Sequence, residues 1–113
     1  MGTTGGEFVD ELIEVLGADR AIDLAEAFGG TRLYVASSVK ANCKIVKAMG
    51  EDVAVALMER FAPTVISVPI LRQQRVIRYS EQGLSIAQIA TRLLITERGV
   101  QRVLRQHRER KTP

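Results

Sequence analysis

The chain of 113 residues has no tryptophan, one cysteine and one histidine. A single cysteine, Cys43, cannot form an internal disulfide, and no histidine lies near it in the sequence to make a nucleophilic pair. His107 stands alone among charged residues, and no spacing of ligands typical of a metal site occurs. Because only three phenylalanines and two tyrosines supply aromatic rings, aliphatic residues and alanine must fill most of the interior, which favours closely packed helices. We therefore expect a mainly helical protein that is not an enzyme and uses no metal or cofactor.

Long apolar runs and a leader of positive charge followed by apolar residues are also absent. A membrane-spanning helix needs about 20 consecutive, mainly apolar residues. The length suits one compact domain, or a small domain with an appended module. The sequence therefore predicts a soluble, cytoplasmic protein that does not bind a membrane.

Charge is divided unevenly along the chain. Residues 71–113 contain ten basic and three acidic side chains, a net charge of +7, whereas residues 1–70 contain six basic and ten acidic ones, a net charge of −4. Clustered arginine is typical of surfaces that bind nucleic-acid phosphates, because neutralising phosphates releases counterions. The alternative is that these arginines only solvate a helix face. We expect double-stranded DNA as the partner of the basic part, while the acidic part could contact RNA polymerase or only keep the protein soluble.

The acidic part contains an internal repeat. The segment LGADRAIDLAEAFGGTRLYVA at 16–36 aligns without a gap with MGEDVAVALMERFAPTVISVP at 49–69, at an offset of 33 residues. The matched positions include Gly17 with Gly50, Asp19 with Asp52, Ala21 with Ala54, Leu24 with Leu57, Phe28 with Phe61 and Val35 with Val68.

Each copy of the repeat, about residues 7–36 and 40–69, predicts a helix, a glycine break, a second helix and a short strand. The second helix of each copy carries an apolar stripe behind an aspartate that could cap it or favour its dipole. In the first strand, Leu33 and Val35 share one face and Tyr34 lies on the other. An antiparallel pair of the two strands with four helices around it would bury both stripes and relate the copies by a pseudo-two-fold axis. Alternatively, each strand pairs with its copy in another subunit, which gives an isologous dimer.

Residues 71–113 predict a helix-turn-helix, the DNA-binding domain of the chain. A helix over 71–81 is stopped by a glycine two residues later. Ser85, with a glutamine three residues on, forms a capping-box pattern, and Thr96 caps the last helix. Leu94 occupies the turn, where glycine is common. Ala90 supplies the small residue where the two helices cross, and the apolar seam consists of Ile89, Leu93, Ile95, Val100, Val103 and Leu104.

The outward face of the last helix is expected to read base edges. Arginine can form two hydrogen bonds to guanine, and glutamine two to adenine. Ser85 and Thr96, at helix N-termini, are expected to bind phosphates. Three further arginines, Arg92, Arg108 and Arg110, are expected to meet solvent or the DNA backbone without reading sequence. The predicted reading residues are Glu97, Arg98, Gln101, Arg102 and Arg105.

A glycine-rich strand entry upstream of an arginine-rich helix-turn-helix is the most specific pattern in the sequence. The segment LAEAFGGTRLYV, followed by LRQQRVIRYSEQGLSIAQIATRLLITERGVQRVLRQ, resembles the Mor/C family, the middle and late transcription activators of Mu-like phages. The resemblance covers nearly the whole chain. It implies that the N-terminal helices and strand form a homodimer, that the C-terminal helices enter successive major grooves, and that the strand lies at the intervening minor groove. By this resemblance Gly29, Gly30, Arg32 and Tyr34 would contact DNA.

The chain departs from the family in two respects. A Thr-Arg pair at 31–32 stands where family members have a polar amide, although arginine suits a narrow, negative minor groove. Simple members also have one helix-helix-strand unit, whereas this chain has a second copy, with Ala62, Pro63 and Ser67 in place of the two glycines and the tyrosine. We expect a prophage-type activator whose region 1–70 is a scaffold for dimerisation, with DNA contacts in the first copy only. Two alternatives stay open: a simple glycine turn with its tyrosine packed on a helix, and an assembly module whose basic tail binds nucleic acid without choosing a sequence.

Overall fold

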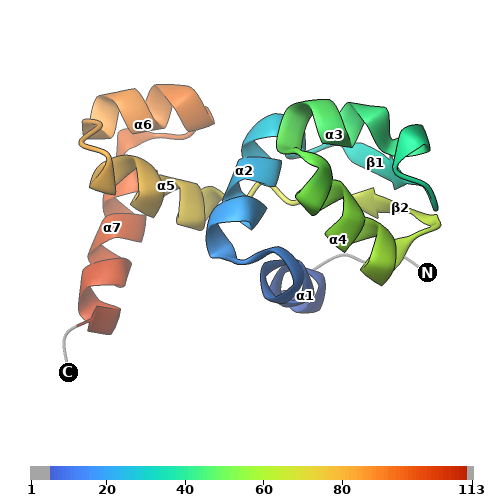
Figure 1. Cartoon of the computed structure of the whole chain (residues 1–113). Coiled ribbons are helices and arrows are strands. Elements are labelled where there is room, and N and C mark those ends of the chain that lie inside the picture. The colour runs from blue at the N-terminus through green and yellow to red at the C-terminus, as the bar shows by residue number, and fades with distance from the viewer. Residues whose placement is uncertain (1–5, 112–113) are drawn as a thin grey trace. The chain divides into compact units, whose positions relative to one another are not determined.

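The computed structural model describes residues 6–111, which form a mainly helical fold with one two-stranded antiparallel sheet in the N-terminal half (Figure 1). The chain divides into two compact units, Met1–Ile70 and Leu71–Pro113, called here the N-terminal and C-terminal units. The described residues of the N-terminal unit form four α-helices and both strands, and those of the C-terminal unit form three α-helices. The predicted fold class is therefore confirmed. None of the helices within residues 6–111 is long and apolar enough to cross a membrane.

Each copy of the repeat folds as a helix, a glycine, a second helix and a strand, as expected. The first copy contains α1 (Gly6–Leu16), α2 (Ala18–Phe28) and β1 (Arg32–Val35). The second contains a 3-10 turn (Lys40–Asn42), α3 (Cys43–Met49), α4 (Glu51–Phe61) and β2 (Thr64–Ser67). Gly17 and Gly50 are the N-caps of α2 and α4, with φ of 86° and 96°, a region that glycine adopts without strain. These glycines have no side chain with which to cap the helix, and Asp19 and Asp52 lie in the first turn, where a carboxylate favours the helix dipole.

The two strands pair with each other within one chain. The antiparallel partners are Arg32 with Ser67, Leu33 with Ile66, Tyr34 with Val65, and Val35 with Thr64. The repeat offset carries the first of these pairs onto the third, and it carries the Leu33–Ile66 pair onto itself. A pseudo-two-fold axis therefore passes through the Leu33–Ile66 pair. Of the two pairings that the sequence leaves open, the structure contains the one inside the chain.

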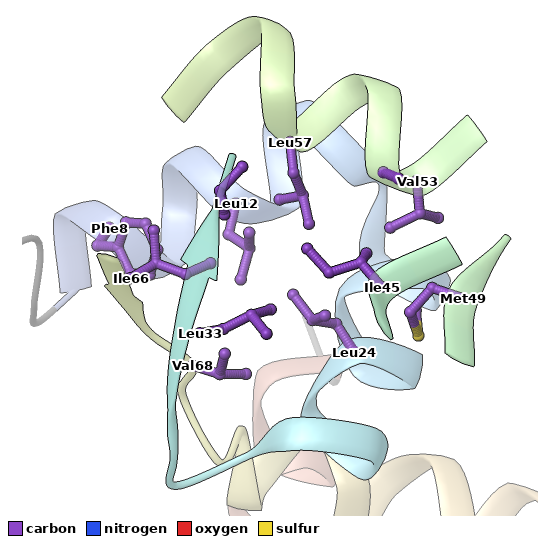
Figure 2. Packing of buried hydrophobic residues seen from close by; sticks show 12 residues of the cluster. Phe8, Leu12, Leu24, Leu33, Ile45, Met49, Val53, Leu57, Ile66 and Val68 are labelled. Carbon is purple, nitrogen blue, oxygen red and sulfur yellow. The ribbon is translucent and has the colours of Figure 1, made fainter. Parts of the chain in front are cut away.

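The inner face of the sheet and the four helices of the N-terminal unit enclose one apolar core (Figure 2). Figure 2 shows the strand side chains Leu33, Ile66 and Val68 lying among side chains of the helices. Both copies contribute equivalent residues, each at most 4% exposed: Leu24 with Leu57, Leu33 with Ile66, and Val35 with Val68. Full burial of one such side chain stabilises a fold by about 1.5–3 kcal/mol. The two copies thus complete one another's core.

The buried amide of Asn42 holds the connection between the copies. Its nitrogen donates a hydrogen bond of 2.9 Å to the carbonyl oxygen of Ala36, and its oxygen accepts one of 2.8 Å from the N–H of the same residue. A buried polar group must be paired in this way, because an unpaired one retains its desolvation cost. The side chain of Asn42 therefore holds the loop between β1 and α3 closed through the backbone of Ala36.

The C-terminal unit consists of α5 (Arg72–Glu81), α6 (Ile86–Leu93) and α7 (Glu97–Lys111). The three helices pack around a small core of their own. Its buried members are Val76, Tyr79, Ile89, Ala90, Leu93 and Val100, with Leu84, Ile86, Ile95, Val103 and Leu104 partly buried against them. This core includes every residue of the predicted seam.

Candidate nucleic-acid interface

The two helix starts of the helix-turn-helix have the predicted caps. The hydroxyl of Ser85 accepts the N–H of Gln88 at 3.2 Å, and the side-chain oxygen of Gln88 accepts the N–H of Ser85 at 2.8 Å. The hydroxyl of Thr96 accepts the N–H of Gly99 at 3.0 Å. A hydroxyl that accepts a capping bond keeps its own proton as a donor. Both exposed hydroxyls therefore combine a structural role with the donor that a phosphate contact requires.

The turn between α6 and α7 is built on an unusual residue. Leu94 is the C-cap of α6, and it has a left-handed backbone with φ 57° and ψ 43°. Its side chain is 90% exposed. Glycine is common at this position of a helix-turn-helix because it adopts a left-handed backbone without strain. Here a leucine adopts it, at a conformational cost of about 1–2 kcal/mol.

Packing of α7 against α5 and α6 decides which of its side chains point away. Val100 is fully buried, and Val103 and Leu104 lie partly buried beside it. Successive residues of an α-helix are rotated by about 100°, which puts Arg98, Arg102 and Arg105 opposite Val100. All three are exposed. These arginines form one continuous face, which is called here the arginine face.

Two other predicted reading residues lie beside this face and not on it. Gln101 borders a hollow of about 270 Å³, lined by Ser80, Ile86, Gln101, Leu104, His107 and Arg108. Glu97, in the first turn of α7, falls on the same flank by helical rotation. Both side chains are exposed, so they can contact a molecule that binds the arginine face, but only at the edge of that face.

A stack of two arginines on a buried tyrosine was not foreseen from the sequence. Tyr79 is 1% exposed, and the guanidinium of Arg92 lies 5.0 Å from the centre of its ring. The guanidinium of Arg75 lies 5.8 Å from the same ring, and its Nε donates a 3.1 Å hydrogen bond to the tyrosine hydroxyl. Such cation–π contacts contribute about 0.5–2 kcal/mol. The four-residue spacing of Arg75 and Tyr79 on one helix is a usable sequence signal, whereas the contact from Arg92 depends on tertiary packing.

The outer face of the sheet is open. Tyr34 is 59% exposed and its cross-strand partner Val65 is 51% exposed, while Arg32 and Ser67, which face each other in the ladder, are also exposed. The alternative in which Tyr34 packs on a helix is therefore wrong. An arginine and a tyrosine two residues apart share one strand face.

The glycines at the entry to β1 are explained by the N-terminal unit itself. A Cβ on Gly29 would clash with the carbonyl oxygen of Ala25 and would lie 3.3 Å from the Cα of Ile70. Gly30 has φ 83°, and its N–H donates to the carbonyl oxygen of Val68 at 2.9 Å. Close approach of the chain's own backbone is thus sufficient reason for Gly29, and the positive φ is sufficient reason for Gly30. DNA contact by the two glycines stays a prediction.

Within the C-terminal unit the structure brings the predicted residues of α6 and α7 together, and within the N-terminal unit it places Arg32 and Tyr34 on the outer face of β1. Within residues 6–111, no group of three or more histidine, cysteine, aspartate or glutamate side chains could hold a metal ion. Comparison with protein-family models, with curated proteins and with solved structures finds no match for this chain.

Proposed function

We propose that this chain is a sequence-specific DNA-binding regulator of transcription, and that it acts as a phage or prophage activator of the Mor type. The observation that carries the proposal is the arginine face of α7. The side of α7 opposite Arg98, Arg102 and Arg105 packs into the core of the C-terminal unit, so these side chains are held outward on a rigid element.

The geometry of a DNA major groove suits such a helix. The groove is about 12 Å wide, admits an α-helix, and presents guanine N7 and O6 to a guanidinium. In a helix-turn-helix, the cap hydroxyls of Ser85 and Thr96 would donate to phosphates while the second helix reads bases. Arg92, held on Tyr79, would supply a fixed positive charge for the backbone and no sequence preference. Arg32 and Tyr34 offer a cation and a ring for a second contact through the outer strand face.

Selection from a random duplex library tests the proposal directly. The full chain should enrich a defined sequence. Arg102→Ala should then reduce the preference for one base pair of that sequence by about 1–3 kcal/mol, because a two-hydrogen-bond contact is lost. Arg108→Ala is the matched control on the flank of α7, and it should weaken all sequences alike and lower the salt slope by about 1.

Two outcomes separate the competing explanations. If the library yields no enriched sequence and both variants lose affinity equally on all duplexes, the chain is a non-specific binder, as in the assembly-module alternative. If Arg32→Ala changes neither DNA affinity nor its salt slope while Arg102→Ala still lowers base preference, β1 does not contact DNA and the proposed interface is limited to α7. Transcription from a promoter that carries the selected site decides between activation and repression. Adding purified RNA polymerase tests whether the acidic helices contact it or only keep the protein soluble.

A further inference from the structure

The pairing of β1 with β2 lies within one chain, where a homodimer would pair strands between subunits. Two identical subunits that meet on a two-fold axis make an isologous contact, in which the same surface is used twice. Here the repeat offset maps the strand ladder onto itself about the Leu33–Ile66 pair, so one chain makes both halves of such a contact. Both central residues are buried, at 4% and 0% exposed.

The core of the N-terminal unit is complete without a second subunit. The side chains that a single copy would leave uncovered, such as Leu24 and Val35, are fully buried by the other copy, as are Leu57 and Ile66 on the opposite side of the axis. A second chain would have to displace these contacts or use another surface. Burial of the N-terminal core therefore does not require strand pairing between subunits.

The functional features are not doubled in the same way. Only the second copy is followed by α5, α6 and α7, and only the first carries an arginine and a tyrosine on its outer strand face. The equivalent outward positions of the second copy are Val65 and Ser67. Residues 6–111 thus contain two scaffold copies, one arginine face and one Arg-Tyr strand face.

We infer that one copy of this chain recognises one asymmetric DNA element, without a second, two-fold-related half-site. The inference rests on the proposed function, because it concerns the DNA that the arginine face reads. It differs from the homodimer implied by the family resemblance, in which two recognition units span half-sites about 10–10.5 base pairs apart.

Three probes test the inference with the full chain. The first is the mass of the free protein by light scattering at micromolar concentration, which should equal one chain of 12.5 kDa. The second is the mass of its complex with the selected duplex, which should contain one chain per duplex. The third is a duplex with the selected element present twice in inverted orientation, with centres about 10–10.5 base pairs apart. Its first binding step should be stronger by only a statistical factor of about two, because no second binding event becomes intramolecular.

A variant on the outer sheet face provides the control. Val65 is 51% exposed on the outer sheet face, so Val65→Asp should leave the mass of the free protein unchanged if the chain acts alone. Only the mass is compared for this variant, because Val65 lies opposite Tyr34, one of the proposed DNA contacts. If instead the free protein is a dimer that Val65→Asp splits, the outer sheet face joins two chains and the inference is wrong. It is also wrong if the selected sequence is palindromic, or if the inverted duplex binds on the order of 10²–10⁴ times more tightly. All three of these results would leave specific DNA binding intact, whereas failure to enrich any sequence would overturn the proposed function together with the inference.

Discussion

Replacing Leu94 by glycine should make the C-terminal unit more stable. A left-handed backbone costs a residue with a Cβ about 1–2 kcal/mol, and Leu94 has φ 57°. Glycine removes this cost but adds about 0.4–1 kcal/mol of backbone entropy to the unfolded chain. Because the side chain is 90% exposed, a tenth of its burial energy, about 0.2–0.3 kcal/mol, is lost with it. We expect a net increase of about 0.5 kcal/mol in the free energy of unfolding.

The absence of tryptophan provides a convenient assay. Tyr79 is buried in the C-terminal unit and Tyr34 is exposed in the N-terminal unit, so in a Tyr34→Phe background the remaining tyrosine fluorescence reports on the C-terminal unit alone. Urea titration should show a higher midpoint for Leu94→Gly with an unchanged slope. Leu94→Ala keeps the Cβ and its strain, so its midpoint should stay close to that of the parent.

A second leucine in the same backbone conformation gives the opposite expectation. Leu71 has φ 53°, but its side chain is only 7% exposed. Leu71→Gly loses about 1.5–3 kcal/mol of burial, which outweighs the relief of strain, so it should destabilise the protein by about 1–2 kcal/mol.

Destabilisation by Leu94→Gly with no effect of Leu94→Ala would show that position 94 is not strained, and the left-handed geometry of this turn would be wrong.

Three further substitutions test the local structure. Ser85→Ala removes the cap of α6 and should lower the free energy of unfolding of the C-terminal unit by about 0.5–2 kcal/mol in the same titration. Asn42→Ala leaves the buried N–H and carbonyl of Ala36 without their partner. The free energy of unfolding of the N-terminal unit, from a urea titration followed by circular dichroism, should fall by about 2–4 kcal/mol. Gly29→Ala should cost about 1–3 kcal/mol through its clash with the backbone, whereas Ala62→Gly at the equivalent C-cap of α4 should cost only about 0.4–1 kcal/mol; equal losses would exclude the clash.

The repeat made most of the N-terminal unit predictable. Its two copies agree in the glycine that separates the helices, in the apolar stripe of the second helix and in the alternation of apolar residues in the strand. The stripe and the alternation follow from the periods of the helix and the strand, which are properties of the backbone. The partner of each strand could not be predicted, because alternation states which side chains share a face and not which strand lies beside them. Intrachain and intersubunit pairing of Leu33 bury the same kinds of side chain, so only the structure distinguishes them.

The arginine face was predictable for a related reason. Once the seam that includes Val100 is assigned, helical rotation determines where Arg98, Arg102 and Arg105 lie. Gln101 is predicted with them as a reading residue, although it follows Val100 directly and is rotated by only about 100° from it, and the hollow beside it emerged only from the packing of α5 and α6 against α7. Exposure of Tyr34 was equally beyond reach, because the sequence does not state whether a helix covers the second face of a sheet.

The two strands also show where the copies of the repeat were free to differ. Inward positions keep aliphatic residues in both, with Leu33 matching Ile66, because each must fill a share of one closely packed core. Outward positions differ in kind: a cation and a phenol in the first strand match a valine and a hydroxyl in the second. In a dimer of identical chains, every outward side chain appears twice about the axis. Fusion into one chain removes this constraint, so one half of a symmetric scaffold can carry a contact surface while the other half only completes the core.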